Sequence, residues 1–340
     1  MTRKQLLHRF VAAFAFLAAA DGSGAALDPG DHEFSLTHKQ LRRSYLVHVP
    51  PQAAAGKPLP VVLNYHGGGA NARNQKWYSR MDETAAREGF IVVYPNGTGG
   101  IGDRLLTWNA GTCCGRAAAS QVDDVGFSLA LLDDLGKRIA LDRMRVYATG
   151  LSNGSMMAYR LAAEAPERIA AVAGVAGAMT LPKFAPALPV PVMHIHSVDD
   201  QRALYGGGLG PAFPFTDTRV FHQSVDAMLG LWIAHNACPA QPQVSGPSSG
   251  KPGAKDATHS AIRYTHAPCR NGAEVVLWKL TGAGHVWPGG VQDYLRLILG
   301  TSTTVIDANA EIWQFFSRFR REKQVGERTA YGTTPPGICL

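Results

Sequence analysis

One serine lies at a junction between a strand-like and a helix-like segment, and this junction constrains the fold more than any other feature. The pentapeptide Gly-Leu-Ser-Asn-Gly at 150–154 follows the β-branched segment 145–149 (RVYAT) and precedes the helix-forming segment 155–165 (SMMAYRLAAEA). In a nucleophile elbow, the serine of G-x-S-x-G sits on a sharp strand-to-helix turn, where Cβ atoms at the flanking positions would collide with neighbouring segments. The pattern predicts Ser152 as a nucleophile at the carboxyl edge of a β-sheet.

The same pattern occurs a second time, as Gly-Pro-Ser-Ser-Gly at 246–250. This copy lies inside the stretch 244–257, which is rich in Ser, Gly, Pro and Lys and which we expect to be a surface loop. We expect no strand before Ser248 and no helix after it, so we interpret this copy as a linker.

Short β-branched runs alternate with helical patterns along the body of the chain. Segment 121–140 shows the helical pattern, because Val125, Leu129 and Leu132 recur every three or four residues. Alternation of this kind predicts an α/β protein with a mainly parallel central sheet and helices on both faces, which together with the elbow is the α/β-hydrolase fold. The expected strands are 44–49, 59–65, 90–94, 145–149, 169–176, 190–196 and 274–280, and the expected helices are 80–88, 121–140, 153–165 and 308–319.

The two ends of the chain differ in composition from its body. Residues 1–26 have a basic start, an apolar run at 10–20 and small residues at 23–26, which is the pattern of a secretory signal peptide. The run is too short to span a bilayer comfortably. We therefore expect secretion to an extracellular or periplasmic location, a single catalytic domain at 27–322 and a basic tail at 323–340.

The net charge of +7 is concentrated at these two ends, so the body is close to balanced. We read the basic tail as solvated rather than as a nucleic-acid surface. The expected partner is a small-molecule or oligomeric substrate, with no nucleic acid and no membrane, and the oligomeric state stays open.

Export makes disulfides possible, and the chain has five cysteines. Cys238 and Cys269 bracket a polar, Pro/Gly-rich stretch and form the most plausible bridge. Cys113 and Cys114 are adjacent, and a bond between neighbours is strained, so one of them could pair with Cys339. Buried, unpaired thiols are an equal alternative for these three residues.

A glycine-rich turn, His-Gly-Gly-Gly at 66–69, follows the expected strand 59–65. Glycines there let the backbone approach a substrate carbonyl and turn an N–H toward it. We predict an oxyanion hole made of the backbone N–H groups of Gly68 and Asn153.

Candidates for the acid and the base follow Ser152 in the order that this fold uses, Ser, then Asp or Glu, then His. The strand 190–196 runs into Asp199 and Asp200, and the strand 274–280 runs into a glycine turn that holds His285. His285 would take the serine proton at Nε2 while a carboxylate binds its Nδ1–H. Spacing does not decide between Asp199 and Asp200, because neighbouring side chains point in different directions.

Two further patterns have competing interpretations. His194 and His196 share one face of a strand and could bind a metal, but no third ligand is evident, so packing in the core or behind the site is preferred and we predict no metal site. The segment 97–102 matches the G-x-G-x-x-G of dinucleotide-binding proteins, but the residues after it do not open a helix of the expected length.

Several longer motifs resemble one known family, the extracellular polyhydroxybutyrate depolymerases and feruloyl esterases. The resemblance covers about residues 34–319 and is carried by YHGGGANA, GFIVVYPNGTG, TWNAGTCCG, VDDVGF, RVYATGLSNGSMMAYRLAAE, PVMHIHSVDD and GAGHVWPGG. It implies Ser152 as nucleophile, His285 as base and, through the family pattern H-G-T-x-D-x-x-V-P-Y at 196–205, Asp200 as acid. The sequence departs from that pattern at Ser197, Val198, Ala203 and Leu204, and Ser155 stands where the family usually has Gly.

The same resemblance implies that His66, Tyr205 and Trp287 help to bind the substrate. It implies two-step acyl transfer through an acyl-enzyme, with no metal and no organic cofactor. Hydroxyalkanoate esters or oligomers are the preferred substrates, and feruloyl or acetyl-xylan esters are the alternative. A non-catalytic binding module and a nucleotide-dependent oxidoreductase are the remote alternatives.

Overall fold

The computed structural model describes residues 27–213 and 217–321. The expected signal peptide at 1–26 and the basic tail at 323–340 lie outside the described residues. No helix among the described residues is long and apolar enough to cross a membrane.

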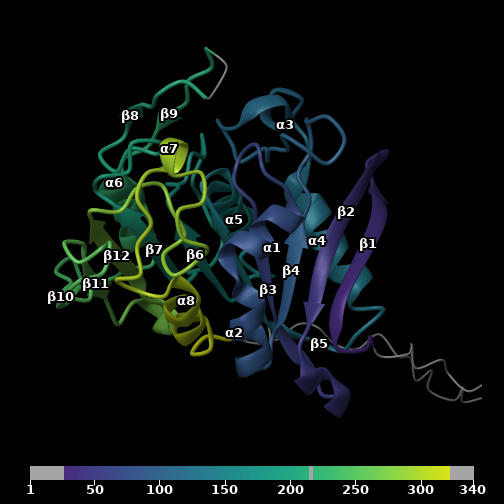
Figure 1. Ribbon diagram of the computed structural model, residues 1–340. Helices are drawn as coiled ribbons and strands as arrows, with labels where there is room; N and C mark the ends of the chain where they lie inside the picture. The colour runs from purple at the N-terminus through teal and green to yellow at the C-terminus, as the bar shows by residue number, and fades with distance from the viewer. Residues whose placement is uncertain (1–26, 214–216, 322–340) are drawn as a thin grey trace, which may run out of the picture.

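Ten strands of this described part form one twisted sheet (Figure 1). They are β1 (Gly30–His38), β2 (Leu41–Val49), β3 (Leu59–Tyr65), β4 (Ile91–Pro95), β5 (Leu141–Leu151), β6 (Ala171–Val175), β7 (Val192–Ser197), β10 (Gln243–Ser249), β11 (Ser260–His266) and β12 (Val275–Thr281). Their order in the sheet is β1-β2-β4-β3-β5-β6-β7-β12-β11-β10. The short strands β8 (Gly208–Leu209) and β9 (Phe221–His222) pair separately.

The six central strands, from β4 to β12, are parallel, and antiparallel pairs flank them on both sides. The prediction of a mainly parallel α/β sheet is therefore confirmed. Because parallel strands end at the same edge, the loops that leave β3, β5, β7 and β12 all emerge on one side of the molecule.

Helices cover both faces of the sheet, as the alternating pattern predicts. The helices are α1 (Ala72–Ser79), α2 (Met81–Glu88), α3 (Gly115–Ala119), α4 (Asp124–Leu135), α5 (Asn153–Glu164), α6 (Val225–His235), α7 (Arg296–Leu299) and α8 (Ala308–Phe316), and single 3₁₀ turns lie at Pro51–Ala55 and Arg270–Gly272. One apolar cluster joins α4, α5 and α6 to one face, and a second joins α2 and α8 to the other. In β3, Leu63 belongs to the first cluster and Val62 to the second, so a central strand is buried on both sides.

The prediction of a surface loop over 244–257 is wrong in its first half. Residues Gln243–Ser249 form the edge strand β10, which pairs with β11 and is almost entirely exposed. A strand with no buried face carries no period-two apolar signal, so its composition resembles that of a loop. The pairing with β11 creates the strand, and the sequence of this segment alone does not.

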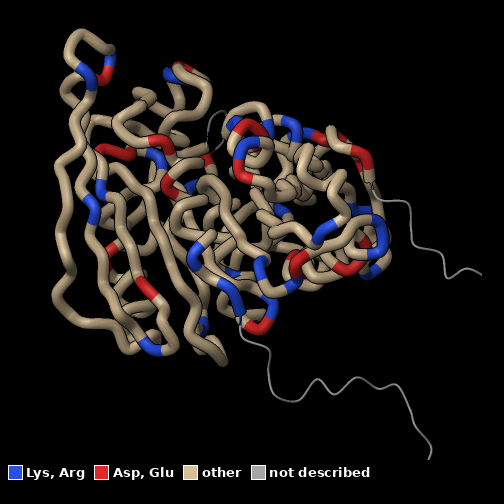
Figure 2. Tube along the Cα trace, turned by 90° about the horizontal axis from the view of Figure 1, so that it is seen from below, with Lys and Arg blue, Asp and Glu red and all other residues tan. Residues whose placement is uncertain are grey.

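Charged positions of both signs are interspersed along the chain in the view from below (Figure 2). Many of them are paired, as in the bidentate bond from Arg318 to Glu274, with N–O distances of 2.7 Å. Such exposed pairs each contribute little stability, at most about 1 kcal/mol.

Candidate active site

Ser152 occupies the turn between β5 and α5, with an unusual backbone conformation of φ 58° and ψ −121°. A non-glycine residue with positive φ costs free energy, so the surroundings must hold it there. Part of that support is visible, because the Ser152 N–H donates to the carbonyl of Val175 at 2.9 Å. Leu151 and Asn153 are buried, whereas Ser152 is partly exposed.

The glycines on either side of Ser152 are required by close backbone contacts. A Cβ on Gly150 would lie 2.6 Å from the carbonyl of Gly154, and a Cβ on Gly154 would lie 2.2 Å from the carbonyl oxygen of Tyr65. Both distances are far below van der Waals contact. The turn therefore has the geometry of a nucleophile elbow, packed against the end of β3.

The glycine turn after β3 lies beside this elbow. A Cβ on Gly67 would stand 3.6 Å from Cβ of Ser152, and a Cβ on Gly68 would stand 3.6 Å from Cβ of Asn153. Asn153 opens α5, where the first backbone N–H groups have no partner within the helix. The two residues predicted for the oxyanion hole are thus neighbours in space.

Trp108 fixes the position of Asn153, a role that residue spacing does not predict. The Asn153 side chain accepts from the backbone N–H of Trp108 at 2.7 Å and donates to the backbone carbonyl of Trp108 at 3.2 Å. This two-way contact clamps the start of α5 to the loop that follows β4. The motif TWNAGTCCG contains Trp108, but nothing in its spacing identifies the partner.

His285 and Asp200 form a close pair at the same edge of the sheet. Nδ1 of His285 lies 2.7 Å from Oδ2 of Asp200, and both residues are buried. Burial alone would raise the pKa of Asp200, but the neighbouring histidines His285 and His196 hold it well below its usual value. The other oxygen of Asp200 accepts the backbone N–H groups of Arg202 and Ala203 at 2.8 and 2.9 Å, so the carboxylate has partners on both oxygens.

Asp199, the alternative acid, binds elsewhere. Its Oδ2 accepts the backbone N–H of Gly282 at 2.6 Å, which tethers the loop that leads to His285. The backbone N–H of His285 in turn donates to the carbonyl of Leu299 at 2.6 Å. Two adjacent carboxylates therefore have different tasks: Asp200 contacts the imidazole, and Asp199 holds its loop.

The three side chains expected to bind substrate are all buried. His66 is fully buried, with Nδ1 2.8 Å from the Gly67 carbonyl and Nε2 accepting from the Gly97 N–H at 3.0 Å, and burial lowers its pKa to about 4. The Tyr205 hydroxyl donates to Asp226, and the Trp287 indole donates to Asn309. A contact with substrate would require other side chains to move, so this role stays a prediction.

The hydrogen bond between His66 and Gly97 indicates why the segment 97–102 is rich in glycine. Thr98 pairs with Thr107 in an isolated β-bridge, and a Cβ on Gly97 would lie 2.4 Å from the Thr107 carbonyl oxygen. The glycines thus serve a tight loop packed on the HGGG turn, and no helix opens directly after them.

Two disulfides are present in the described part. Cys238 and Cys269 are joined, as the sequence predicts, and they close a loop of sequence separation 31. Cys113 and Cys114 are joined to each other across a cis peptide bond. The predictions of a bridge from this pair to Cys339, and of free thiols at both positions, are therefore wrong, and Cys339 itself lies outside the described residues.

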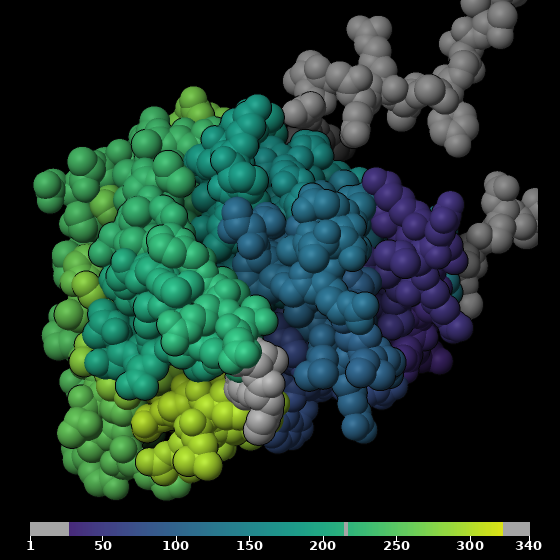
Figure 3. Space-filling model, turned by 90° about the horizontal axis from the view of Figure 1, so that it is seen from above, coloured from purple at the N-terminus to yellow at the C-terminus, as the bar shows by residue number. Residues whose placement is uncertain are grey.

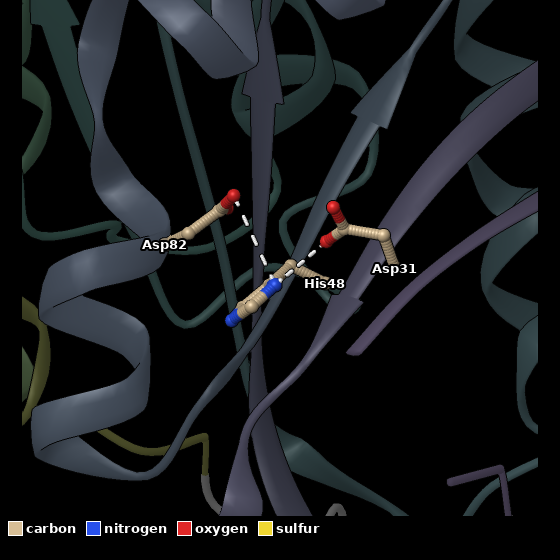
Figure 4. A group of neighbouring side chains, drawn as sticks. All are labelled: Asp31, His48 and Asp82. Carbon is tan, nitrogen blue, oxygen red and sulfur yellow. Dashed lines mark hydrogen bonds and ion pairs between the residues drawn. The ribbon is translucent and has the colours of Figure 1, made fainter. Parts of the chain in front are cut away.

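A cluster of Asp31, His48 and Asp82 has the composition of a metal site (Figure 4). His48 Nδ1 lies 2.8 Å from Asp31 and 3.8 Å from Asp82. The ammonium group of Lys76, however, pairs with both carboxylates, and Asp82 also accepts from the Tyr94 hydroxyl at 2.7 Å. Since the Lys76 ammonium group already pairs with both carboxylates, we interpret the cluster as an ion-pair network that ties β1 and β2 to α1 and α2.

A cavity of about 810 Å³ opens beside this network, between the first strand, α1 and residues 290–292. Neither Ser152, Asp200 nor His285 lines it. It is distinct from the carboxyl edge of the sheet, which Figure 3 shows from above, where segments 200–213, 217–230 and 285–300 lie near the loop after β4.

The parallel sheet, the elbow and the contact between His285 and Asp200 at one edge are those of the α/β-hydrolase fold. Residues 43–231 match the family described as Esterase PHB depolymerase, and the chain belongs to this family. The family match makes the protein a serine-type carboxylic ester hydrolase.

The relatives include the "Putative esterase NocK" of Nocardia uniformis subsp. tsuyamanensis, which is 31% identical over 273 residues, 76% of this chain and 75% of the relative. The "Bifunctional acetylxylan esterase/xylanase XynS20E" of Neocallimastix patriciarum is 27% identical over 72% of this chain, which spans 31% of that longer protein. The crystal structure of native sOPH superposes with a TM-score of 0.50 at 16% identity, over 79% of this chain and 84% of that one, and shows likeness of fold.

Proposed function

We propose that Ser152, His285 and Asp200 act as a catalytic triad that hydrolyses carboxylic esters through an acyl-enzyme. The observation that carries the proposal is the 2.7 Å contact between His285 Nδ1 and Asp200, at the sheet edge where Ser152 occupies its strained turn. The ionised Asp200 keeps the proton of His285 on Nδ1, which leaves Nε2 as the base.

In the first step, the Ser152 oxygen attacks the ester carbonyl carbon while its proton passes to Nε2 of His285. The N–H groups of Gly68 and Asn153 stabilise the negative charge that develops on the carbonyl oxygen. Each such donor contributes about 3 kcal/mol to lowering the barrier. The ester C–O bond then breaks, and His285 returns the proton to the departing alcohol.

In the second step, a water molecule gives a proton to His285 and attacks the acyl carbon. The bond to Ser152 breaks, the serine regains its proton, and the carboxylic acid leaves. None of these steps uses a metal or an organic cofactor.

The proposed substrates are hydroxyalkanoate esters or oligomers. Six large apolar side chains that are more than a third exposed lie on the segments that follow β4, β7 and β12 at the carboxyl edge of the sheet, which supports an apolar acyl chain over a hydrated one. These side chains are Ile101, Leu105, Leu209, Phe221, Leu295 and Leu297. The alternative, an ester of plant polysaccharide, is supported by the acetylxylan esterase among the relatives.

We further propose that one catalytic domain at 27–322 is exported by residues 1–26. The bridge between Cys238 and Cys269 supports export, because such bonds persist in oxidising compartments.

A panel of esters tests the proposal, with p-nitrophenyl butyrate, 3-hydroxybutyrate oligomers, methyl ferulate and acetylated xylan. We expect the highest kcat/KM on the oligomers and no turnover of any ester by Ser152→Ala. A preference for acetylated xylan or methyl ferulate would move the assignment to polysaccharide esters. Activity of Ser152→Ala above a tenth of the wild-type value would overturn the triad.

A further inference from the structure

Behind Asp200 lies a row of buried hydrogen-bonding side chains that the mechanism above does not use. His194 and His196 project from the same face of β7, and Tyr159 reaches them from α5. The Tyr159 hydroxyl is 2.9 Å from Nδ1 of His194, and Nε2 of His194 is 2.9 Å from Nδ1 of His196. Nε2 of His196 is 3.2 Å from Oδ2 of Asp200. All four side chains are nearly or fully buried.

The acceptors at the Asp200 end determine where the protons lie. Nε2 of His196 faces two acceptors, Asp200 and the carbonyl of Ala203 at 2.7 Å, so this nitrogen carries a proton. Nδ1 of His196 then accepts from Nε2–H of His194, and Nδ1 of His194 faces the Tyr159 hydroxyl, which also lies 3.1 Å from the carbonyl of Met193. Both ring N–H groups point toward the Asp200 end of the row.

The reverse direction would place a second proton on His196, whose Nε2 already carries one. His196 is buried, and a low-dielectric interior solvates a charged imidazolium poorly, so the geometry favours the first direction. All four ring nitrogens of the two histidines have hydrogen-bond partners, so the pair has no free ligand atom for a metal ion.

We propose that His196 is a positioning residue for Asp200, and that His194 and Tyr159 hold it in the tautomer that this task requires. The inference rests on the proposed triad. Oδ2 of Asp200 lies near Nδ1 of His285 and Nε2 of His196, while Oδ1 accepts hydrogen bonds from two backbone N–H groups. Without His196 the chain still folds, but the Asp200 carboxylate can tilt away from His285. That tilt weakens the control of the His285 tautomer.

The test compares kcat and KM on p-nitrophenyl butyrate for variants along the row. His196→Leu removes the donor, and His196→Gln keeps an N–H at the same number of bonds from the backbone. We expect His196→Leu to lower kcat by about 10–100-fold, by analogy with lost hydrogen-bond partners of metal-binding histidines, with KM changed less than about twofold. His196→Gln should recover most of this loss.

Tyr159→Phe removes the far end of the row and should lower kcat a few fold. Its matched control is Tyr147→Phe, which removes the hydroxyl of another buried tyrosine that donates to the Phe319 carbonyl at 2.7 Å. The proton on Nδ1 of His285 gives a second readout, because a proton shared with a carboxylate resonates far downfield in the NMR spectrum. Tyr159→Phe should shift this resonance, and Tyr147→Phe should not.

Wild-type kcat in folded His196→Leu would overturn the proposal, as would identical kcat and identical resonances in Tyr159→Phe and Tyr147→Phe. If His196→Leu does not fold, the tyrosine pair decides alone. Ser152→Ala and His285→Ala are measured in parallel. If these two retain activity, the proposed triad fails; if they are inactive and the tyrosine pair is indistinguishable, only the role of His196 fails.

Discussion

The two copies of G-x-S-x-G have the same spacing and opposite surroundings. Ser152 sits at the end of a central strand, with positive φ and glycine neighbours pressed against backbone carbonyls. Ser248 belongs to the exposed edge strand β10 and is paired with Ala261 of β11. A serine in an extended edge strand has no helix N-terminus beneath it and no histidine from a neighbouring parallel strand.

The glycines do not separate the two copies. In the 246–250 copy Gly246 has φ +112°, and a Cβ on Gly250 would lie 1.9 Å from the carbonyl oxygen of Asp256. Both copies thus need their glycines for backbone reasons. The difference lies in what the sheet brings to the serine, and this is decided by tertiary structure.

The largest effect should come from removing the hydroxyl of Ser152, compared with removing that of Ser248. Ser152→Ala should lower kcat on p-nitrophenyl butyrate by at least about 10⁴-fold, because no other group in the site supplies the nucleophile. Ser248→Ala is the control and should keep wild-type kinetics. Equal losses in the two variants would end the distinction between the copies.

The second comparison concerns the two adjacent carboxylates. Asp200→Asn should lower kcat by about 10³–10⁴-fold, since the amide no longer enforces the His285 tautomer. Asp199→Asn should change kcat by a factor of about three or less, because an amide oxygen still accepts the Gly282 N–H. Steady-state kinetics on both variants provides the measurement, and the reverse ranking would move the acid by one residue.

The disulfide between Cys238 and Cys269 encloses the 246–250 copy and leaves the elbow free of any cross-link. The double variant Cys238→Ser/Cys269→Ser should therefore have a lower free energy of unfolding and an unchanged kcat. The bond closes a loop with a sequence separation of 31, which lowers the entropy of the unfolded chain and so stabilises the folded state by about 3–4 kcal/mol. Urea unfolding should show this loss, while kcat of the folded variant stays near the wild-type value. A large fall in kcat would mean that the loop also shapes the site.

The smallest effect concerns Ser155, whose hydroxyl donates to the Gly177 carbonyl at 2.6 Å inside the elbow. Ser155→Gly, the residue usual in the family, should cost about 1–2 kcal/mol through the lost hydrogen bond and the added backbone freedom. Ser155→Ala separates the two causes, because it loses only the hydrogen bond. Thermal unfolding gives the ranking, and a Ser155→Gly variant as stable as the wild type would contradict it.

The central strands and the elbow were predictable from the sequence, because strands buried on both faces are continuous apolar runs and the elbow has a local motif. The hairpin partner β1 was missed, since its alternation GDHEFSLTH is mostly polar. Helix α6 was also missed, although Val225, Met228, Leu229 and Trp232 form its buried face. No motif flanks this helix, so short sequence patterns do not predict it.

For the candidate site, chain order predicted candidates for the acid and the base but not which of Asp199 and Asp200 contacts His285. That contact depends on which way the loop turns after β7, and spacing along the chain does not encode the turn. The bond between Cys113 and Cys114 and the clamp of Trp108 on Asn153 are likewise contacts that residue spacing does not encode.

The edges of the large sheet have a consequence for the protein in concentrated solution. An exposed edge strand invites another chain to add a strand, which is a route to aggregation. At one end, Pro247 offers β10 no N–H and the register with β11 breaks between Ser245 and Ser248. At the other, β1 turns Asp31 and Glu33 outward. Both edge strands thus disfavour the addition of a strand from another chain. The protein should therefore not aggregate at concentrations where a sheet of this width with regular, uncharged edge strands would precipitate.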